Sequence, residues 1–446
     1  MTDLNVRSRI TSDHYRELQL TAKELSKKEN TRYIIESSVR QFDDRTRITV
    51  QLIDGSRDRH LWVENFDPKL TDIINVQGSI ATQVALQLKK EIPGTQIRQT
   101  RKIPTKSHEA YDLYLRGRFL LNKSDGEERT DVNKEGLTGS IQYFEKAVAA
   151  DSTFAEAYAC MAKAYLSLAG WGWYQPAREG FSRALKLSMK ALEIDPGLAQ
   201  AHAVKGSVLF WAEHKFEDAK KELLLAIRSS PPYPPVFQTY AQLLMITGPI
   251  EEARIFMDRA LELEPYYWVL HNLNAWICYF EENYPRAIKS CQVAQELKQD
   301  YIFNNWLFFL NYAKNGQGKK AAEELKEIVN KYPAAKHLAD EIPDVFRTSG
   351  IPGLFNWLID VNKNRPFPAA GLSGHPFFIA WWNVLLGNRE QALYWLERNM
   401  EAKDIMFWYL SLIGTNPDFD ILRNEPRFLA IIDQIGLKPY HTRKAR

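Results

Sequence analysis

The chain has 446 residues, of which 45% are hydrophobic and 25% charged, and its formal net charge at pH 7 is +3. This composition is typical of a soluble globular protein with roughly two or three domains, and it excludes a disordered or fibrous chain. The nearly balanced charge gives no reason to expect a specific nucleic-acid partner, and we expect the basic carboxyl end to be a solvated tail.

The cysteines and the amino terminus bear on the compartment. Cys160, Cys278 and Cys291 form no CxxC pair and have no histidine nearby at metal-ligand spacing, so we expect neither zinc nor a disulfide framework. The start, MTDLNVRSRI, lacks the pattern of a signal peptide, and no window is apolar enough to span a membrane. We therefore expect a cytoplasmic chain with free thiols, the periplasm being the alternative.

The first hundred residues alternate between two periodicities. Helical spacing over 15–28 is followed by three runs with strand character, RYIIESSVRQF, RTRITVQLID and HLWVENF, and helical spacing returns over 69–91. An Asp-Asp pair and Gly55-Ser56 separate the runs and favour turns. The order of helix, three antiparallel strands and helix predicts a small α+β domain over 1–92. The polar, proline-containing stretch 93–108 is typical of a linker.

An internal repeat follows the linker. Similar six-residue segments begin 35, 34, 34 and 34 positions apart, and 34 residues is the length of the tetratricopeptide repeat. The segments are ALEIDP, AIRSSP, ALELEP, AQELKQ and IVNKYP. Small residues recur where the two helices of each repeat must approach closely, namely Ala219, Ala253, Ala287 and Ala321. We therefore predict tetratricopeptide repeats over 109–340.

The repeat is irregular at both ends. An earlier repeat has a spacing of 44, because the segment GWGWYQPARE is inserted between its helices. After residue 340 the pattern decays, although 376–400 still predicts a helix pair around Gly387-Asn388. We expect 341–446 to be degenerate helical repeats and a carboxyl-terminal cap. The predicted fold class is mainly α: a small α+β domain followed by a right-handed helical superhelix with a concave face.

The strand region resembles a known family. The blocks Tyr33 to Arg40, Arg47 to Asp54 and His60 to Asp67 are similar to the domain related to the amino-terminal domain of TolB, although Ser37 stands where that family usually has glycine. The resemblance extends through the repeats to the closing FDILRNEPRF. In this family the domain and the repeats accompany bacterial adenylate cyclase domains or CadC-like DNA-binding regulators.

The resemblance also implies what the chain lacks. The family's domain usually begins with an earlier strand and helix, and the family's effector domain is not found in 1–446. We therefore expect a truncated TolB-like domain, an effector encoded nearby, and self-association through an uncovered sheet edge. The missing first strand is a segment that another chain could supply.

Four sequence features resemble catalytic motifs, and each has a simpler interpretation. Residues 315–320 lack the spacing of a phosphate-binding loop, and 371–375 lack the second glycine of a nucleophile elbow. The Glu-Glu pairs suit the starts of helices, and His60 has no partner at catalytic spacing. We expect no catalytic, cofactor-binding or metal-binding residue, and therefore no enzyme.

A binding surface is predicted instead. In the tetratricopeptide family, set positions of the first helix of each repeat line the concave groove. Seven residues fall there: Gln238, Gln242, Met245, Asn272, Trp276, Tyr279 and Trp306. Amides bind peptide backbones and aromatic rings contact apolar side chains. Whether Trp276 and Trp306 contact a ligand or belong to the core stays open.

These features favour a protein-interaction scaffold that binds a protein or peptide segment and is linked to bacterial signalling or transcription. Two alternatives are a subunit of a nucleotide cyclase and a transcriptional regulator. The first would need metal-binding aspartates in a catalytic domain, and the second a DNA-recognition helix, and neither feature is found in the sequence.

Overall fold

The computed structural model describes most of the chain. The described ranges are 20–42, 45–67, 73–87, 104–124, 131–170, 176–229, 233–299, 301–333, 335–364, 375–402 and 410–438, with single residues 12, 15 and 18. The chain divides into two compact units. The first comprises Met1–Lys205 and Leu225–Tyr233, and the second Gly206–Leu224 and Pro234–Arg446.

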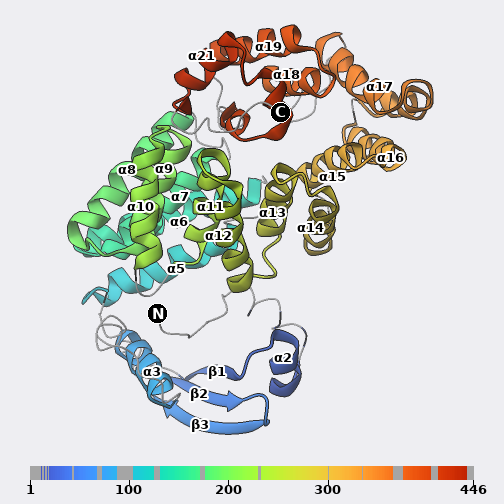
Figure 1. The fold of residues 1–446 in the computed structure, drawn as a ribbon. Helices are drawn as coiled ribbons and strands as arrows, with labels where there is room; N and C mark the ends of the chain where they lie inside the picture. Colours follow the sequence, from blue (N-terminus) through green and yellow to red (C-terminus); the bar gives the residue numbers. More distant parts are fainter. Residues whose placement is uncertain are drawn as a thin grey trace. The chain divides into compact units, whose positions relative to one another are not determined.

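The amino-terminal elements confirm the predicted order of helix, three strands and helix (Figure 1). They are α2 (Ala22–Glu29), β1 (Tyr33–Phe42), β2 (Arg45–Asp54), β3 (Arg59–Phe66) and α3 (Ile73–Gln87). Tyr15, where the predicted helical stretch begins, is helical, Leu18 lies in a turn, and α2 begins anew at Ala22, where Thr21 and Glu24 form a capping box. Several residues between 13 and 19 lie outside the described ranges.

The strands form an antiparallel sheet in the order β1-β2-β3. Tyr33 lies opposite Asp54 at one end of the β1–β2 ladder, and the β2–β3 register shifts between Leu52 and Ile53. Ala22 of α2 contacts Ile34 and Ile53 in a small core cluster. On the other face of the sheet, Val50 and Leu52 are almost completely buried.

The described residues from 108 onwards are mainly helical, and most of these helices form antiparallel pairs. The pairs of the regular region are α5 (His108–Ser124) with α6 (Asp131–Ala150), α7 (Ala155–Gly170) with α8 (Ala177–Ile194), α9 (Ala199–Trp211) with α10 (Phe216–Arg228), α11 (Pro235–Thr247) with α12 (Ile250–Leu263), α13 (Trp268–Phe280) with α14 (Tyr284–Leu297), and α15 (Ile302–Lys314) with α16 (Gly318–Asn330). The second helices begin at Phe216, Ile250, Tyr284 and Gly318, which is one start every 34 residues. This period confirms the predicted tetratricopeptide-repeat fold class.

Small residues permit the close approach of paired helices. Ala253, Ala287 and Ala321 are completely buried, as predicted. Gly206 is needed for the same reason, because a Cβ atom there would lie 2.7 Å from the Leu223 side chain. Within each unit, neighbouring pairs also pack against each other, as α6 does against α7 and α14 against α15.

The carboxyl-terminal part departs from the regular repeat. Its elements are η2 (Lys336–Glu341), α17 (Ile342–Asn364), α18 (Pro376–Leu385), α19 (Arg389–Ala402), η3 (Leu412–Gly414), η4 (Pro417–Leu422) and α21 (Pro426–Gln434). Helix α17 is interrupted at Gly350, whose φ of +62° lies in the left-handed region. Helices α18 and α19 form the pair predicted over 376–400, with Gly387 at φ +79° in the turn. Within the described ranges, no helix is both long and apolar enough to cross a membrane.

Candidate functional site

The seven predicted groove residues do not share one environment. They lie on α11, α13 and α15, the first helices of three successive repeats. Gln238, Gln242, Asn272 and Trp276 are half-buried, whereas Met245, Tyr279 and Trp306 are buried. The structure therefore divides the predicted groove into an accessible polar part and a covered part.

The chain's own carboxyl-terminal segment covers the second part. The ring of Trp381 on α18 lies 5.8 Å from Trp276 and 6.1 Å from Tyr279, measured between centroids. On the same helix, Trp382 stacks on Trp306 at 6.3 Å with an interplanar angle of 24°. These contacts place two aromatic residues of α18 against α13 and α15.

A buried carboxylate connects the same elements. Asp418 of η4 accepts hydrogen bonds from the Tyr279 hydroxyl at 2.5 Å, from Trp381 Nε1 at 2.8 Å and from Lys314 Nζ at 2.6 Å. Burial, and next the Asp418 charge, hold the pKa of Tyr279 well above its usual range. Burial alone would lower the pKa of Lys314, but attraction to Asp418 outweighs it and the pKa is raised. Lys314 therefore stays protonated at neutral pH, beside the Asp418 carboxylate.

Backbone contacts hold the neighbouring residues of this segment in place. The Thr415 hydroxyl donates a hydrogen bond of 2.5 Å to the Met245 carbonyl of α11. Gly414 lies against the Ile246 carbonyl, where a Cβ atom would be only 3.3 Å away. The buried Arg423 guanidinium donates to the carbonyls of Gly414 and Asn416. Together these bonds fix η3 and η4 on the inner face of the repeats.

The accessible part keeps unused hydrogen-bonding capacity. Asn272 Nδ2 donates to Asn304 Oδ1 at 3.3 Å, and Asn304 Nδ2 donates to the Cys291 carbonyl. The Gln242 Oε1 and Trp306 Nε1 atoms are buried but have no hydrogen-bond partner within the described chain. Buried polar atoms normally have a partner, so an acceptor is left unsatisfied at Gln242 in the accessible part and a donor at Trp306 in the covered part.

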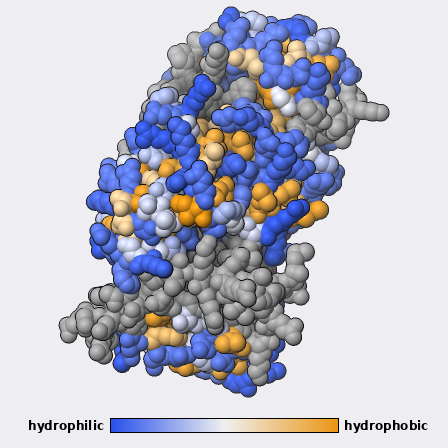
Figure 2. Space-filling view, turned by 90° about the vertical axis from the view of Figure 1, so that its left-hand side faces the viewer, coloured by the Kyte–Doolittle hydropathy of each residue, from blue (hydrophilic) through white to orange (hydrophobic). Residues whose placement is uncertain are grey.

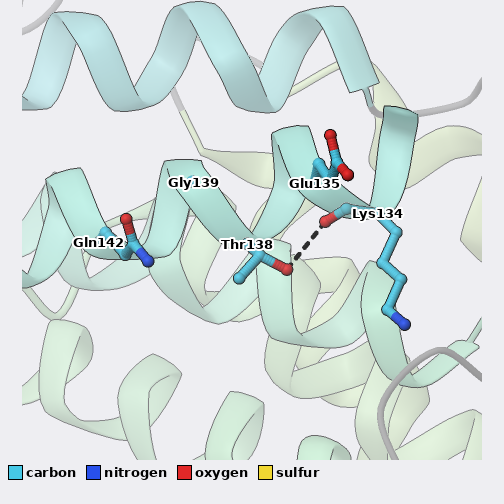
Figure 3. Close-up of a pocket in the computed structure, with 5 residues that line it drawn as sticks. All are labelled: Lys134, Glu135, Thr138, Gly139 and Gln142. Carbon is cyan, nitrogen blue, oxygen red and sulfur yellow. Dashed lines mark hydrogen bonds between the residues drawn. The ribbon is translucent and has the colours of Figure 1, made fainter. Parts of the chain in front are cut away.

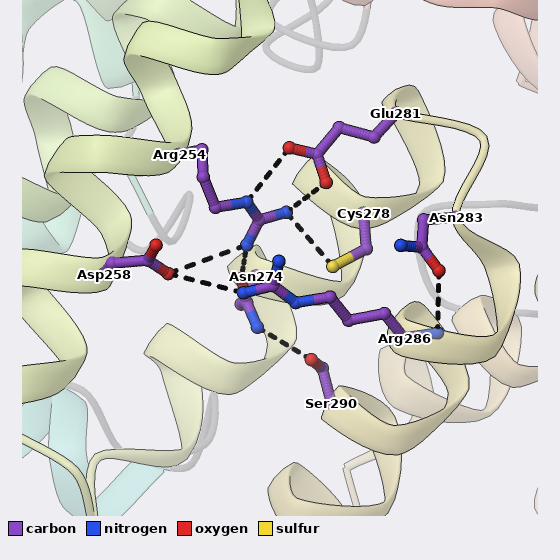
Figure 4. Close-up of polar contacts among 8 residues, drawn as sticks. All are labelled: Arg254, Asp258, Asn274, Cys278, Glu281, Asn283, Arg286 and Ser290. Atoms are coloured by element: carbon purple, nitrogen blue, oxygen red, sulfur yellow. Dashed lines mark hydrogen bonds and ion pairs between the residues drawn. The ribbon is translucent and has the colours of Figure 1, made fainter.

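A second polar cluster lies between α12 and the helix pair that follows it (Figure 4). The Arg254 guanidinium donates to both carboxylate oxygens of Glu281, at 3.0 and 2.5 Å, and also to Asn274 Oδ1 and to Cys278 Sγ. Asn274 in turn donates to Ser290 of α14 at 2.7 Å. Burial raises the pKa of the Cys278 thiol, and Arg254 only partly opposes it. This cluster sets the position of consecutive repeats and leaves Cys278 protonated.

Two surface depressions do not bring together groups suited to chemistry. One is lined by five residues of a single helix, α6, and the Thr138 hydroxyl there donates to the Lys134 carbonyl of its own helix (Figure 3). The other includes Asp151, whose carboxylate accepts from Thr105 and Thr153. These hydrogen bonds lower the pKa of Asp151 and stabilise the start of α7.

The motifs that resemble catalytic sequences occupy ordinary positions. Residues 315 and 316 form the turn before α16, and His60 is exposed on β3. The segment 371–374 lies outside the described ranges. Within those ranges, no group of three or more histidine, cysteine, aspartate or glutamate side chains is arranged to hold a metal ion. The three cysteines are buried thiols.

Comparison with known proteins gives one curated relative. No protein-family model matches the chain. Over 211 residues the chain is 25% identical to "Putative adenylate cyclase 3" of Rhizobium meliloti (strain 1021). This match spans 47% of the chain and only 35% of the relative's own length.

Several solved structures are also similar. YrrB, described as a TPR protein with an unusual peptide-binding site, is 21% identical, with 45% of this chain and 97% of YrrB covered and a TM-score of 0.34. Pseudomonas aeruginosa pilF is 16% identical, with 52% of this chain and 99% of pilF covered and a TM-score of 0.38. Human IFIT1, solved with PPP-AAAA, is 16% identical, with 75% of this chain and 89% of IFIT1 covered and a TM-score of 0.40. All three TM-scores are below 0.5, so these likenesses do not extend to function.

Proposed function

We propose that the chain is a protein-interaction scaffold that binds an extended peptide segment along the accessible inner face of α11 and α13. The observation that carries this proposal is the row of half-buried amides, Gln238, Gln242 and Asn272, beside the unpartnered Gln242 Oε1. A side-chain amide offers both a donor and an acceptor, which complements a peptide unit. Half-buried Trp276, at the border of the covered part, supplies an apolar contact for a ligand side chain.

The covered part limits where a partner can bind. Met245, Tyr279 and Trp306 contact the carboxyl-terminal segment, so they pack within the fold and do not contact a ligand while this segment is in place. A ligand that binds without displacing this segment contacts the side-chain amides of the accessible part. Because amides are uncharged and bind the peptide backbone, we expect the site to select an extended backbone more than a particular ligand charge.

Peptide-library selection against the full chain tests the proposal. We expect the selected peptides to lose binding to the double variant Gln238→Ala/Gln242→Ala, since both backbone-binding amides are removed. The matched control is Gln292→Ala, an exposed glutamine on α14, the second helix of its repeat. Equal binding by the double variant, or selection of no peptide, would contradict the proposal.

We also propose that the amino-terminal sheet is a TolB-like module and that the scaffold serves a bacterial signalling effector. The helix, three strands and helix and the 25% identity to a protein named as an adenylate cyclase support this assignment. The scaffold need not be catalytic for this role. A cyclase assay on the purified chain and capture of the product of an adjacent gene test it. Turnover above background would favour the cyclase-subunit alternative, and specific binding in a gel-shift assay would favour a transcriptional regulator.

A further inference from the structure

The outer edge of β1 is a candidate pairing surface. Among the described residues β1 pairs only with β2, and every residue from Ile35 to Arg40 is exposed. Two of these residues are large and apolar: Ile35 is 55% exposed and Val39 is 66% exposed. Figure 2 shows one face of the molecule, on which hydrophobic residues lie in separate patches among hydrophilic ones.

The ladder determines which backbone groups face this edge. The Gly55 N–H donates to the Arg32 carbonyl at 2.9 Å, which continues the register in which Tyr33 lies opposite Asp54. Arg32 therefore faces β2, and so does every second residue after it. The N–H and C=O groups of Ile35, Ser37 and Val39 consequently point to the open edge.

The side chains of the same three residues lie on the apolar face of the sheet. Ile35, Ser37 and Val39 stand opposite Leu52, Val50 and Ile48 in the register. Val50 and Leu52 are covered, so the apolar face is buried at its centre and exposed along β1. The edge thus combines free backbone groups with exposed apolar side chains, a combination that promotes strand pairing.

We propose that this edge binds a second copy of the chain, with β1 pairing antiparallel to the partner's β1 about a two-fold axis at Ser37. In this register Ile35 lies opposite the partner's Val39, and the reciprocal contact forms on the other side of the axis. Glu36 lies diagonal to the partner's Arg40 on the polar face, within reach of long side chains. The backbone N–H and C=O groups of Ile35, Ser37 and Val39 in one strand then hydrogen-bond to those of the same three residues in the other. Each apolar contact and each charged contact occurs twice, once on either side of the axis.

The opposite edge of the sheet lacks this complementarity. On β3, exposed Val63 lies opposite Gln51, on the polar face. The polar face also carries the Gln51–Glu36 and Thr49–Asn65 hydrogen bonds. Pairing through β3 in the register that faces Trp62 with the partner's Phe66 would place Glu64 directly opposite its own copy, and like charges opposite each other are destabilising, which favours β1.

Sedimentation velocity of the full chain, from low to high micromolar concentration, tests this inference independently of the groove. We expect a dimer whose dissociation constant rises about tenfold or more in Val39→Lys, because each half of the interface loses an apolar pair and gains a charge. The control is Ser38→Lys, an exposed change one residue earlier on the polar face. A wild-type monomer at every concentration, or a dimer insensitive to Val39→Lys, would overturn the proposal.

A second variant tests the register and does not depend on how a lysine is tolerated. Ser37→Cys places two thiols directly opposite each other across the axis, within the Cα separation that a disulfide accepts. Mild oxidation should crosslink this variant into a covalent dimer, whereas Ser38→Cys, on the opposite face and offset from its counterpart, should react much less. Failure of Ser37→Cys to crosslink under conditions in which the chain is dimeric would exclude this register.

Discussion

Tyr279 and Asp418 are separated by 139 residues in the sequence, yet the Tyr279 hydroxyl donates a 2.5 Å hydrogen bond to the buried Asp418 carboxylate. Tyr279 belongs to the inner face of a regular repeat, and Asp418 to the 3-10 helix η4. The bond therefore makes the carboxyl-terminal segment part of the repeat structure and removes Tyr279 from the surface available to a partner.

Asp418→Asn should destabilise the second unit markedly. The substitution leaves Lys314 without its counter-charge, and Lys314 is only 28% exposed. We expect a loss of about 3 kcal/mol, the lower end of the cost of breaking a buried ion pair, because Lys314 keeps some contact with water. The midpoint of urea unfolding, followed by tryptophan fluorescence, measures it. Asp433→Asn removes an exposed pair with Lys438 and should change the free energy of unfolding by less than about 1 kcal/mol.

The two tryptophans that the sequence left undecided should respond differently. Trp306 is 9% exposed and stacks on Trp382, so Trp306→Ala is expected to cost about 3–5 kcal/mol. Trp276 is half-buried, so Trp276→Ala should melt closer to the wild type while weakening peptide binding. Thermal melting by circular dichroism separates them, and the reverse order would show that Trp276 is the core residue.

Arg254→Lys should weaken the contact between the consecutive repeats α11–α12 and α13–α14. Lysine cannot reproduce the two parallel bonds to Glu281 together with the bond to Asn274, so buried acceptors lose their donor. We expect a loss of about 1.5–3 kcal/mol in the free energy of unfolding, the range for hydrogen bonds to charged groups. Arg259→Lys on the same helix alters only an exposed pair with Glu262 and serves as the control. Equal urea midpoints for both variants would show that the cluster contributes no net stability.

Burial raises the pKa of Tyr332 from 10.0 to about 12. The folded phenol holds its proton more tightly than the unfolded one, so this group stabilises the fold fully below pH 10 and loses that contribution as the pH rises towards 12. Tyrosinate absorbance during alkaline titration should show a late component that Tyr332→Phe reduces by the contribution of one tyrosine. An unchanged titration curve in that variant would contradict the assignment.

The thiols should be slow to react in the folded chain. Burial holds the pKa of Cys291 well above its usual range and raises that of Cys278 and Cys160. Because the thiolate is the reactive form, alkylation at neutral pH should be slow before denaturation and complete after it. Mass spectrometry of protein alkylated at cell lysis and then denatured measures both states. A peptide linked through Cys278 and Cys291 would contradict the expected reducing compartment.

The sequence alone determined the elements and their repetition. Alternation of apolar and polar residues located three strands, and the 34-residue period located the helix pairs, because both patterns record which face of a local element is buried. Buried alanines such as Ala253 and Ala287 were predictable for the same reason. These properties depend on neighbours a few positions away, so they can be recognised in the printed chain.

The tertiary structure decided which inner-face residues remain accessible. No periodicity connects Tyr279 with Asp418 or Trp306 with Trp382, because such pairs depend on how the irregular carboxyl-terminal segment turns back onto the repeats. Nor could spacing show that β1 directs the backbone groups of Ile35, Ser37 and Val39 outward, since that depends on which residues of the ladder face β2. A local pattern specifies that a side chain is buried or paired, and only the folded chain specifies its partner.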